Sequence, residues 1–107
     1  REVDTAYMRG VDLLQKRRYA KALYILHEYH DRNTVVTLLS LGHDAQAFEM
    51  LDGLEQTATV EYLKAVACSR LGRKAEGREH FLTACGMDER MQYRGNLDPE
   101  ITELLKE

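Results

Sequence analysis

The chain has 107 residues, 44% of them hydrophobic and 31% charged, which is the composition of one globular domain and excludes a disordered segment. Lys and Arg number 15 against 18 Asp and Glu, a formal net charge of −3, so there is no general attraction to nucleic acid or to an anionic membrane. No apolar run approaches the ~20 residues of a membrane-spanning helix. One proline and abundant Ala, Leu, Glu, Lys and Arg favour long helices.

Helical periodicity dominates the first half of the chain. Small and apolar residues at helical spacing predict one helix before the polar break at 16–18 and a second after it. The segment 33–41 is apolar nearly all round, so we expect it to be covered on several sides. Gly42 is placed to end that helix in a left-handed cap. The first two stripes consist of Ala6, Gly10, Leu13 and Leu14, and of Ala22, Leu26 and Tyr29.

Further helices are predicted in the second half. One spans roughly 44–54, and Thr57 or Thr59 then caps a fifth that ends at Gly72. A sixth is indicated by Gly77, Phe81, Ala84 and Cys85 at i, i+4, i+7 and i+8.

The last part of the chain divides into an irregular and a regular segment. We expect 86–97 to be irregular, with at most one turn near Asp88. Asp98 followed by Pro99 is a strong helix start, since the carboxylate caps and the proline occupies the first helical position. This last helix has an apolar stripe (Ile101, Leu104, Leu105) and a polar face (Glu100, Glu103, Lys106, Glu107), as the end cap of a helical stack would.

Three segments of the chain repeat one pattern. When 17–22, 42–47 and 72–77 are aligned, small residues coincide, and a bulky residue follows one turn later. A small residue lets the second helix of a pair approach the first closely, and the bulky one fills the space between them. The aligned sets are Ala20/Ala45/Ala75, Ala22/Ala47/Gly77, Leu26/Leu51/Phe81, Leu13/Leu38/Cys68 and Gly10/Val35/Ala65.

The stretch from Tyr62 to Ala84 resembles a tetratricopeptide repeat. The resemblance covers roughly residues 4–88 and implies an all-α fold of antiparallel helix pairs stacked as a short right-handed superhelix. The repeats are about 25 and about 30 residues apart instead of the family's ~34, and Glu89 stands where a proline often closes a repeat. The implied boundaries are repeats at about 4–31, 33–55 and 58–88 and a capping helix at 98–106, in a single domain that we expect to belong to a longer chain.

The resemblance also implies a concave groove lined by the first helix of each pair. The family's chaperone-binding members clamp a carboxylate there with asparagines, and this chain has Val11, Val36 and Val66 at those positions, so we reject that clamp. A groove of tyrosine and valine would favour an apolar or amphipathic segment of a protein partner. The implied groove residues are Tyr7, Val11, Leu14, Val36, Leu39, Ser40, Tyr62, Val66, Ser69 and Arg70.

No motif predicts catalysis, a cofactor or a resident metal. His27 and His30 lie three residues apart on one helix, but no third ligand is evident. Cys68 and Cys85 fall on the two helices of one pair and are interpreted as buried apolar fillers, a disulfide remaining the alternative. The absence of a P-loop and of G-x-S-x-G argues against an enzyme.

We therefore expect a non-catalytic protein-interaction module. The alternative is a structural or self-association domain, whose groove is occupied by another part of the full-length protein or by a second copy. Basic turns at 16–18 and 70–74 are interpreted as solvated, with an edge for an acidic partner as the alternative. The sequence establishes no compartment; residues 93–99 and the helix after them resemble C-terminal repeat regions of bacterial envelope proteins, which favours the periplasm or cell envelope.

Overall fold

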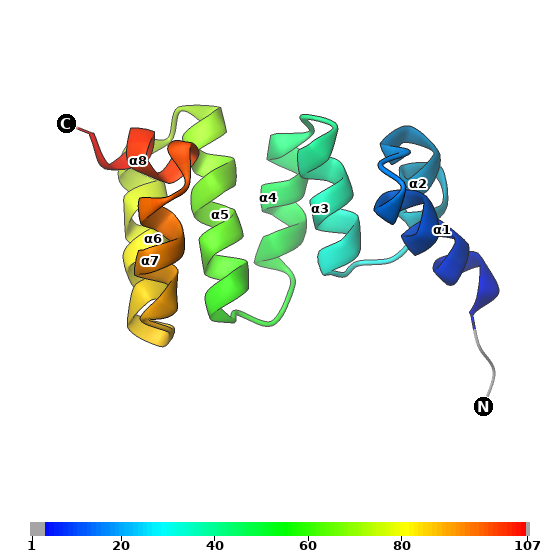
Figure 1. The fold of residues 1–107 in the computed structure, drawn as a ribbon, viewed down its shortest axis with the longest axis horizontal. Helices are drawn as coiled ribbons and strands as arrows, with labels where there is room; N and C mark the ends of the chain where they lie inside the picture. Colours follow the sequence, from blue (N-terminus) through cyan, green and yellow to red (C-terminus); the bar gives the residue numbers. More distant parts are fainter. Residues whose placement is uncertain (1–3, 107) are drawn as a thin grey trace.

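The computed structural model describes residues 4–106, and within that range the regular structure consists of eight α-helices and no strand (Figure 1). The prediction of an all-α fold is confirmed. Glu107, which the sequence placed on the polar face of the last helix, lies outside the described residues. The helices are α1 (Thr5–Gln15), α2 (Tyr19–Leu26), α3 (Arg32–Ser40), α4 (Asp44–Asp52), α5 (Ala58–Leu71), α6 (Lys74–Met87), α7 (Arg90–Asn96) and α8 (Pro99–Leu105).

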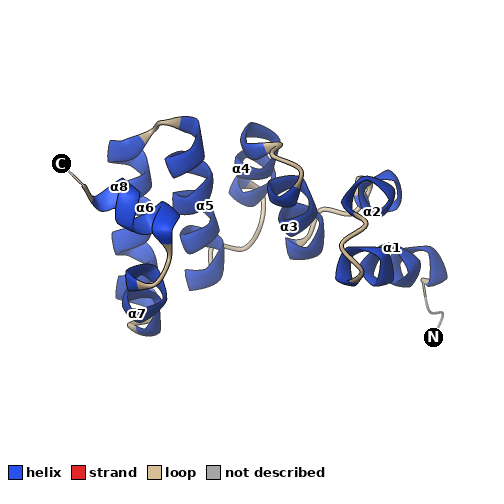
Figure 2. Cartoon of the chain, turned by 45° about the horizontal axis from the view of Figure 1, so that its top comes forward, coloured by secondary structure: helices blue, strands red, loops and turns tan. Residues whose placement is uncertain are grey.

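The first six helices follow one another along the long axis of the molecule, each packed against the next, and α3 to α6 alternate in direction (Figures 1 and 2). The molecule measures 46 × 27 × 23 Å and has a radius of gyration of 14.5 Å. A compact domain of this length has a radius of gyration of about 13 Å, so the chain is elongated. No helix among residues 4–106 combines the length and apolar character needed to cross a bilayer.

The turns inside the three helix pairs share one backbone conformation. Arg17, Gly42 and Gly72 have φ values of 60°, 79° and 77°, and the prediction of a left-handed cap at Gly42 is confirmed. In each turn the next residue donates its N–H to a carbonyl five positions earlier, which is the Schellman motif. These bonds join Arg18 N to Leu13 O, His43 N to Leu38 O and Arg73 N to Cys68 O, each at 2.9 Å.

Arg17 is the one member of this set that carries a side chain at a left-handed position. An L-residue in that conformation costs about 1–2 kcal/mol, so Arg17→Gly is expected to raise the free energy of unfolding by about 0.5–1 kcal/mol, after the larger entropy loss of glycine. Urea denaturation measures the change. Arg18→Gly is the control, because Arg18 has φ −94° and gains nothing from glycine. Equal changes in the free energy of unfolding for Arg17→Gly and Arg18→Gly would show that the left-handed backbone at Arg17 is not strained.

Side-chain caps fix where the first helix of each pair begins. Asp4, Asp31 and Thr57 accept the backbone N–H three residues on, in α1, α3 and α5 respectively. Of the two threonines that the sequence offered, Thr57 is the cap. Asp98 caps α8 by accepting from Glu100 N at 3.0 Å, with Pro99 at the first helical position, as predicted.

The small residues of the repeated pattern lie where the paired helices touch. Ala22 and Ala47 are completely buried. At Gly77 a Cβ would lie 2.9 Å from Cβ of Cys68 and 2.7 Å from Cδ1 of Leu104, so α5, α6 and α8 pack closely there. The close helix approach inferred from the sequence is confirmed at Gly77.

The segment after α6 is more regular than the sequence indicated. The prediction that 86–97 is irregular is wrong, because α6 continues to Met87 and α7 follows at Arg90–Asn96. Together α7 and α8 form what we call the cap, which packs on α5 and α6 (Figure 1). Within α8, Ile101 and Leu104 are buried as expected, whereas Leu105 is 39% exposed and is not part of the inner stripe.

Candidate functional site

The cap occupies the part of the predicted groove that α5 was expected to provide. Tyr62, expected as an exposed aromatic anchor, has 0% of its surface exposed, and this expectation is wrong. Its hydroxyl donates to Oδ2 of Asp98 at 2.7 Å, and the Arg94 guanidinium lies 4.2 Å from its ring centroid. Burial, followed by the bond to Asp98, raises the pKa of Tyr62. Tyr62 therefore holds the cap in place.

Two further groove residues of α5 bind the cap as well. Ser69 donates to the carbonyl of Glu100 at 2.8 Å. Arg70 binds the Glu100 carboxylate through Nε at 2.6 Å, and its Nη1 donates to the Leu39 carbonyl at 2.7 Å and to Asp44 at 3.0 Å. The guanidinium thus joins α3, α4, α5 and α8, and its donors are used within the fold.

Tyr7, the groove residue at the other end of the stack, connects α1 to α3. Its hydroxyl donates to the carboxylate of Asp31, which caps α3, and accepts from Asn33 Nδ2 at 2.8 Å. Its ring centroid lies 4.8 Å from that of Tyr29. Burial, and then the Asp31 bond, raise the pKa of Tyr7. Its polar group is therefore already partnered.

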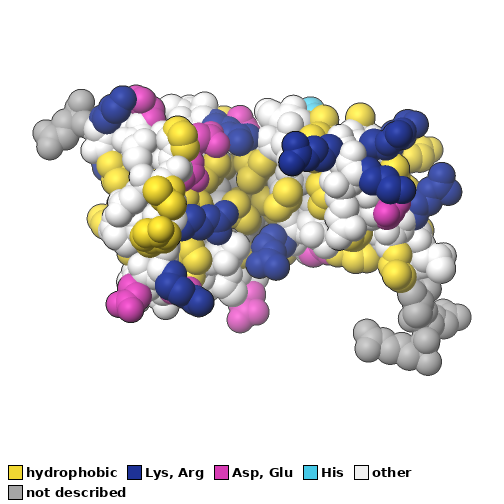
Figure 3. Space-filling view, in the orientation of Figure 1, with side chains coloured by type: hydrophobic (Ala, Val, Ile, Leu, Met, Phe, Trp, Pro, Cys, Tyr) yellow, Lys and Arg dark blue, Asp and Glu magenta, His cyan; other side chains and the backbone are white. Residues whose placement is uncertain are grey.

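The remaining groove positions, apart from the exposed Ser40, are only partly accessible. Leu39 and Val66 are buried, Val11 and Leu14 are half-buried, and Val36 is 37% exposed. Hydrophobic side chains are visible in the middle of this face, between α5 and α3 (Figure 3). The structure therefore does not bring the predicted residues together as one open groove.

A surface hollow lies elsewhere, between α1 and α2. It has a volume of about 1030 Å³. At about 100° per residue, Arg9, Asp12 and Lys16 lie on the face of α1 opposite Tyr7, which is the face turned away from α3. Lys and Arg side chains gather over this end of the molecule (Figure 3). The lining residues are Thr5, Ala6, Arg9, Asp12, Leu13, Lys16, Arg18, Lys21, Tyr24 and Ile25.

The two basic turns identified in the sequence differ in their surroundings. At the C-terminal turn, Arg70 is bound to Asp44 and Glu100, and Lys74 lies 3.8 Å from Glu103. At the N-terminal turn the hollow has Arg9, Lys16, Arg18 and Lys21 on its rim against a single carboxylate, Asp12, which pairs with Lys16 at 3.0 Å. A surplus of positive charge therefore surrounds this hollow.

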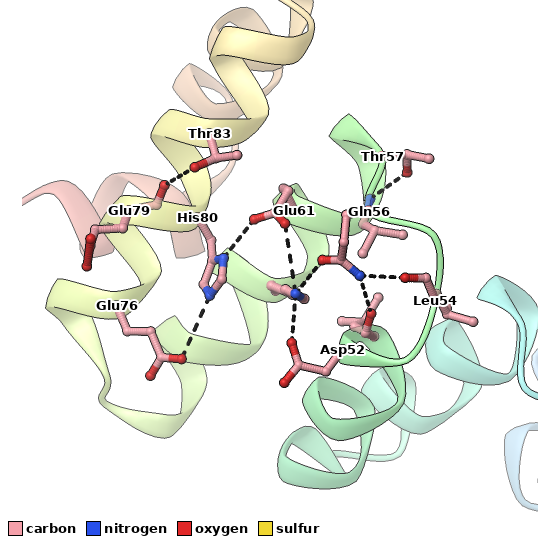
Figure 4. Close-up of polar contacts among 12 residues, drawn as sticks. Asp52, Leu54, Gln56, Thr57, Glu61, Glu76, Glu79, His80 and Thr83 are labelled. Carbon is pink, nitrogen blue, oxygen red and sulfur yellow. Dashed lines mark hydrogen bonds and ion pairs between the residues drawn. The ribbon is translucent and has the colours of Figure 1, made fainter.

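A polar cluster lies between α4, α5 and α6 and is partly open to solvent (Figure 4). His80 Nδ1 lies 2.7 Å from Oε1 of Glu61, and His80 Nε2 lies 3.7 Å from Oε2 of Glu76. Lys64, with 5% of its side chain exposed, binds Asp52 at 2.8 Å and lies 3.8 Å from Glu61. Gln56 accepts from Lys64 and donates to the Leu51 carbonyl.

The two cysteines are free thiols. Cys68 is completely buried beside the polar cluster, and burial, followed by the Glu76 charge, raises its pKa to about 11. Cys85 is half-buried, and burial raises its pKa as well. The disulfide that the sequence left as an alternative is not formed.

No family model, no curated protein and no solved structure matches the chain. The class of protein that the structure establishes is an all-α domain of consecutively packed helices. The relation to tetratricopeptide repeats remains the resemblance carried by residues 62–84 and by the three equivalent turns.

The end hollow and the polar cluster were both missed by sequence reasoning, although each had a signal. Arg9, Asp12 and Lys16 recur at helical spacing on the face of α1 opposite Tyr7. Glu76 and His80 are four residues apart, so they share one face of a helix. Cys68 comes from α5, the other helix of the pair, and only the packing of α5 on α6 shows that its thiol lies close to Glu76 and His80.

Proposed function

We propose that this protein is a non-catalytic protein-interaction module that binds an acidic amphipathic helix of a partner in the hollow between α1 and α2. The observation that carries the proposal is the composition of that hollow, an apolar floor inside a basic rim. The proposal keeps the class of function expected from the sequence and moves the binding surface from the concave groove to the end of the stack.

The apolar part of the hollow supplies the anchor. Leu13 and Ile25 are half-buried in its floor. Tyr24 stands at its edge with 82% of its surface exposed, the highest value among the exposed large hydrophobic side chains of residues 4–106. Exposed aromatic side chains are frequent anchors at protein interfaces, because they bury much area and lose little conformational entropy.

Charge and length indicate which polypeptide fits. The rim cations would pair with carboxylates that flank an apolar ridge, and such pairs speed association and fix orientation more than they add affinity. The side of α1 that lines the hollow runs from Thr5 to Lys16. It is about 18 Å long at ~1.5 Å per residue, which matches a partner helix of about three turns. The apolar floor favours an amphipathic helix over nucleic acid, whose binding depends on phosphate contacts.

Fluorescence anisotropy with a labelled amphipathic peptide of roughly 15 residues, long enough for three to four turns, tests the proposal. The peptide carries leucines at i, i+3, i+4 and i+7 between glutamates, and a scrambled peptide of the same composition is the reference. We expect the patterned peptide to bind more tightly, and Tyr24→Ala to weaken it about tenfold or more. Lys21→Glu should weaken binding and reduce its dependence on salt.

Matched variants separate this surface from the alternatives. Tyr93→Ala removes an aromatic side chain that is 72% exposed on α7, and Arg32→Glu changes the net charge as Lys21→Glu does; both should leave binding unchanged. Equal weakening by Tyr93→Ala, or tighter binding of a DNA oligonucleotide than of the peptide, would contradict the proposal. Light scattering that shows dimers abolished by Tyr24→Ala would assign the hollow to self-association instead.

A further inference from the structure

Three metal-binding side chains converge where α5 packs on α6. They are Cys68 from α5 and Glu76 and His80 from α6, and their donor atoms all lie within 4.8 Å of one another. Glu76 and His80 lie one turn apart on the same face of α6. Gly77 lets α5 come close enough for Cys68 to join them, since a Cβ there would meet Cβ of Cys68 at 2.9 Å.

The chemistry of these donors, and the distance between two of them, suit a tetrahedral divalent cation. An ion with bonds of about 2.0–2.3 Å to N, O and S holds neighbouring ligands about 3.3–3.8 Å apart. His80 Nε2 and Glu76 Oε2 are 3.7 Å apart, so one ion reaches both without movement of the helix backbone. A thiolate, an imidazole and a carboxylate together form a donor set typical of zinc.

Glu61 holds the histidine in the orientation that a metal requires. Its carboxylate lies 2.7 Å from His80 Nδ1 and can only accept, so in the neutral imidazole the proton sits on Nδ1 and Nε2 offers its lone pair. Histidines that bind metals almost always donate their other ring N–H to such a partner. The His80 ring is held further by the edge-on Phe48 ring, with centroids 5.8 Å apart.

The charges around the cluster also favour a cation. Three carboxylates (Asp52, Glu61 and Glu76) lie around it against two cations (Lys64 and Arg73), an excess of one negative charge. A divalent ion that displaces the Cys68 proton to solvent adds one net positive charge, so the filled site is neutral, which reduces the cost of burying charge. The other charged groups that act on the Cys68 thiol are Glu76 and Asp52, which are negative, and Arg73 and Lys64, which are positive.

The cluster is reachable from solvent on one side. Cys68 is buried, but the Glu76 side chain is 47% exposed and the His80 side chain 22% exposed. Burial keeps the thiol of the metal-free protein protonated, with a pKa of about 11. A metal ion bound first by Glu76 and His80 would lower that pKa and permit the S–H bond to be replaced by a metal–sulfur bond.

We propose that Cys68, Glu76 and His80 bind one divalent cation of the zinc type, which joins α5 to α6 and leaves the fourth coordination position to water. Glu61 is a positioning residue that acts through His80. This site is independent of the hollow between α1 and α2, which lies at the other end of the molecule (Figure 1).

Titration of the full chain with Co²⁺ alone, followed by absorption spectroscopy, tests the site, because tetrahedral Co²⁺ absorbs visibly and accepts the same donors. We expect one equivalent to bind, with a thiolate-to-cobalt charge-transfer band and with displacement by one equivalent of Zn²⁺. Cys68→Ser should abolish the charge-transfer band, whereas Cys85→Ser should retain it. A spectrum that lacks the band, or retains it in Cys68→Ser, would overturn the proposal.

Substitutions at the carboxylates test the site even if the Cys68→Ser protein does not fold. Glu76→Gln should weaken Co²⁺ binding at least tenfold, whereas Glu79→Gln, three residues further along α6 and exposed, should not. Glu61→Gln should weaken binding by about 10- to 100-fold while the charge-transfer band stays, since the thiolate ligand remains. Equal affinities of the Glu76→Gln and Glu79→Gln proteins would also overturn the site.

Discussion

Replacing Lys64 with methionine is expected to lower the free energy of unfolding by about 1–2 kcal/mol. The ammonium group lies 2.8 Å from Asp52, donates to Gln56 and sits 5.9 Å from the Phe48 ring centroid, in a side chain that is 5% exposed. Removing it leaves the buried Glu61 carboxylate with His80 as its partner, whereas Gln56 and Asp52 are exposed and can turn to water. The loss stays below the largest values for buried ion pairs because Glu61 keeps His80.

Urea denaturation followed by circular dichroism measures this change. Lys74→Met is the control, because the Lys74 side chain is 44% exposed and lies 3.8 Å from Glu103. Exposed ion pairs contribute little, so this control should change stability by no more than about 0.5 kcal/mol. If the two variants lose the same stability, Lys64 is not the buried centre of the network.

Gly95→Ala is the second substitution with a large expected effect. A Cβ at this position in α7 would lie 2.5 Å from both Cε1 and Cζ of Phe81, whose ring is buried and cannot move aside freely. The cap must therefore shift away from α6. Overpacking costs about 1–3 kcal/mol, and this loss exceeds the ~1 kcal/mol that alanine gains over glycine inside a helix. We expect a net loss of about 1–2 kcal/mol.

Gly86→Ala provides the matched control. Gly86 lies within α6, and a Cβ added there would have no neighbouring atom within 4 Å, so alanine should stabilise the protein by about 0.5–1 kcal/mol. Hydrogen exchange should also become faster in α7 and α8 of the Gly95→Ala protein, because the cap is the element displaced. A stabilised Gly95→Ala protein would show that the cap is packed more loosely than the structure indicates.

The helix pairs were predictable because their signals are local. Stripes of apolar residues, glycine at a left-handed turn and a threonine or aspartate before a helix act within a few residues of one another. The equivalence of Arg17 with Gly42 and Gly72 also followed from alignment, although arginine gives no sign of a left-handed conformation. Its place in the Schellman bond pattern imposes that φ value.

The cap was missed because its causes are distant in the sequence. The stretch 90–96 has no apolar stripe, and its helix depends on Gly95 meeting Phe81 and on Arg94 covering Tyr62. The same distance explains the error at the groove. A tyrosine at helical position 62 has the pattern of a surface anchor, and only the return of Asp98 over a separation of 36 residues buries it.

The proposed binding residues were predictable only in part. The basic turn at 16–18 was recognised in the sequence. The equivalent turn at 70–74 also carries three cations, but Asp44, Glu100 and Glu103 neutralise it. The sequence alone does not distinguish an arginine that pairs with a carboxylate from one that has no such partner. Tertiary contacts decide which of two similar charge clusters retains a surplus.

The attachment of the cap through Asp88 and Glu89, the short connection between α6 and α7, has a consequence for competition. A segment tethered so closely has an effective concentration in the millimolar range or above at the surface it covers. A free peptide that binds at Tyr62, Ser69 and Arg70 would have to displace the cap, which is present at this high local concentration and makes its own contacts there. The tethered cap thus covers this face of α5, whereas the hollow between α1 and α2 is open to solvent.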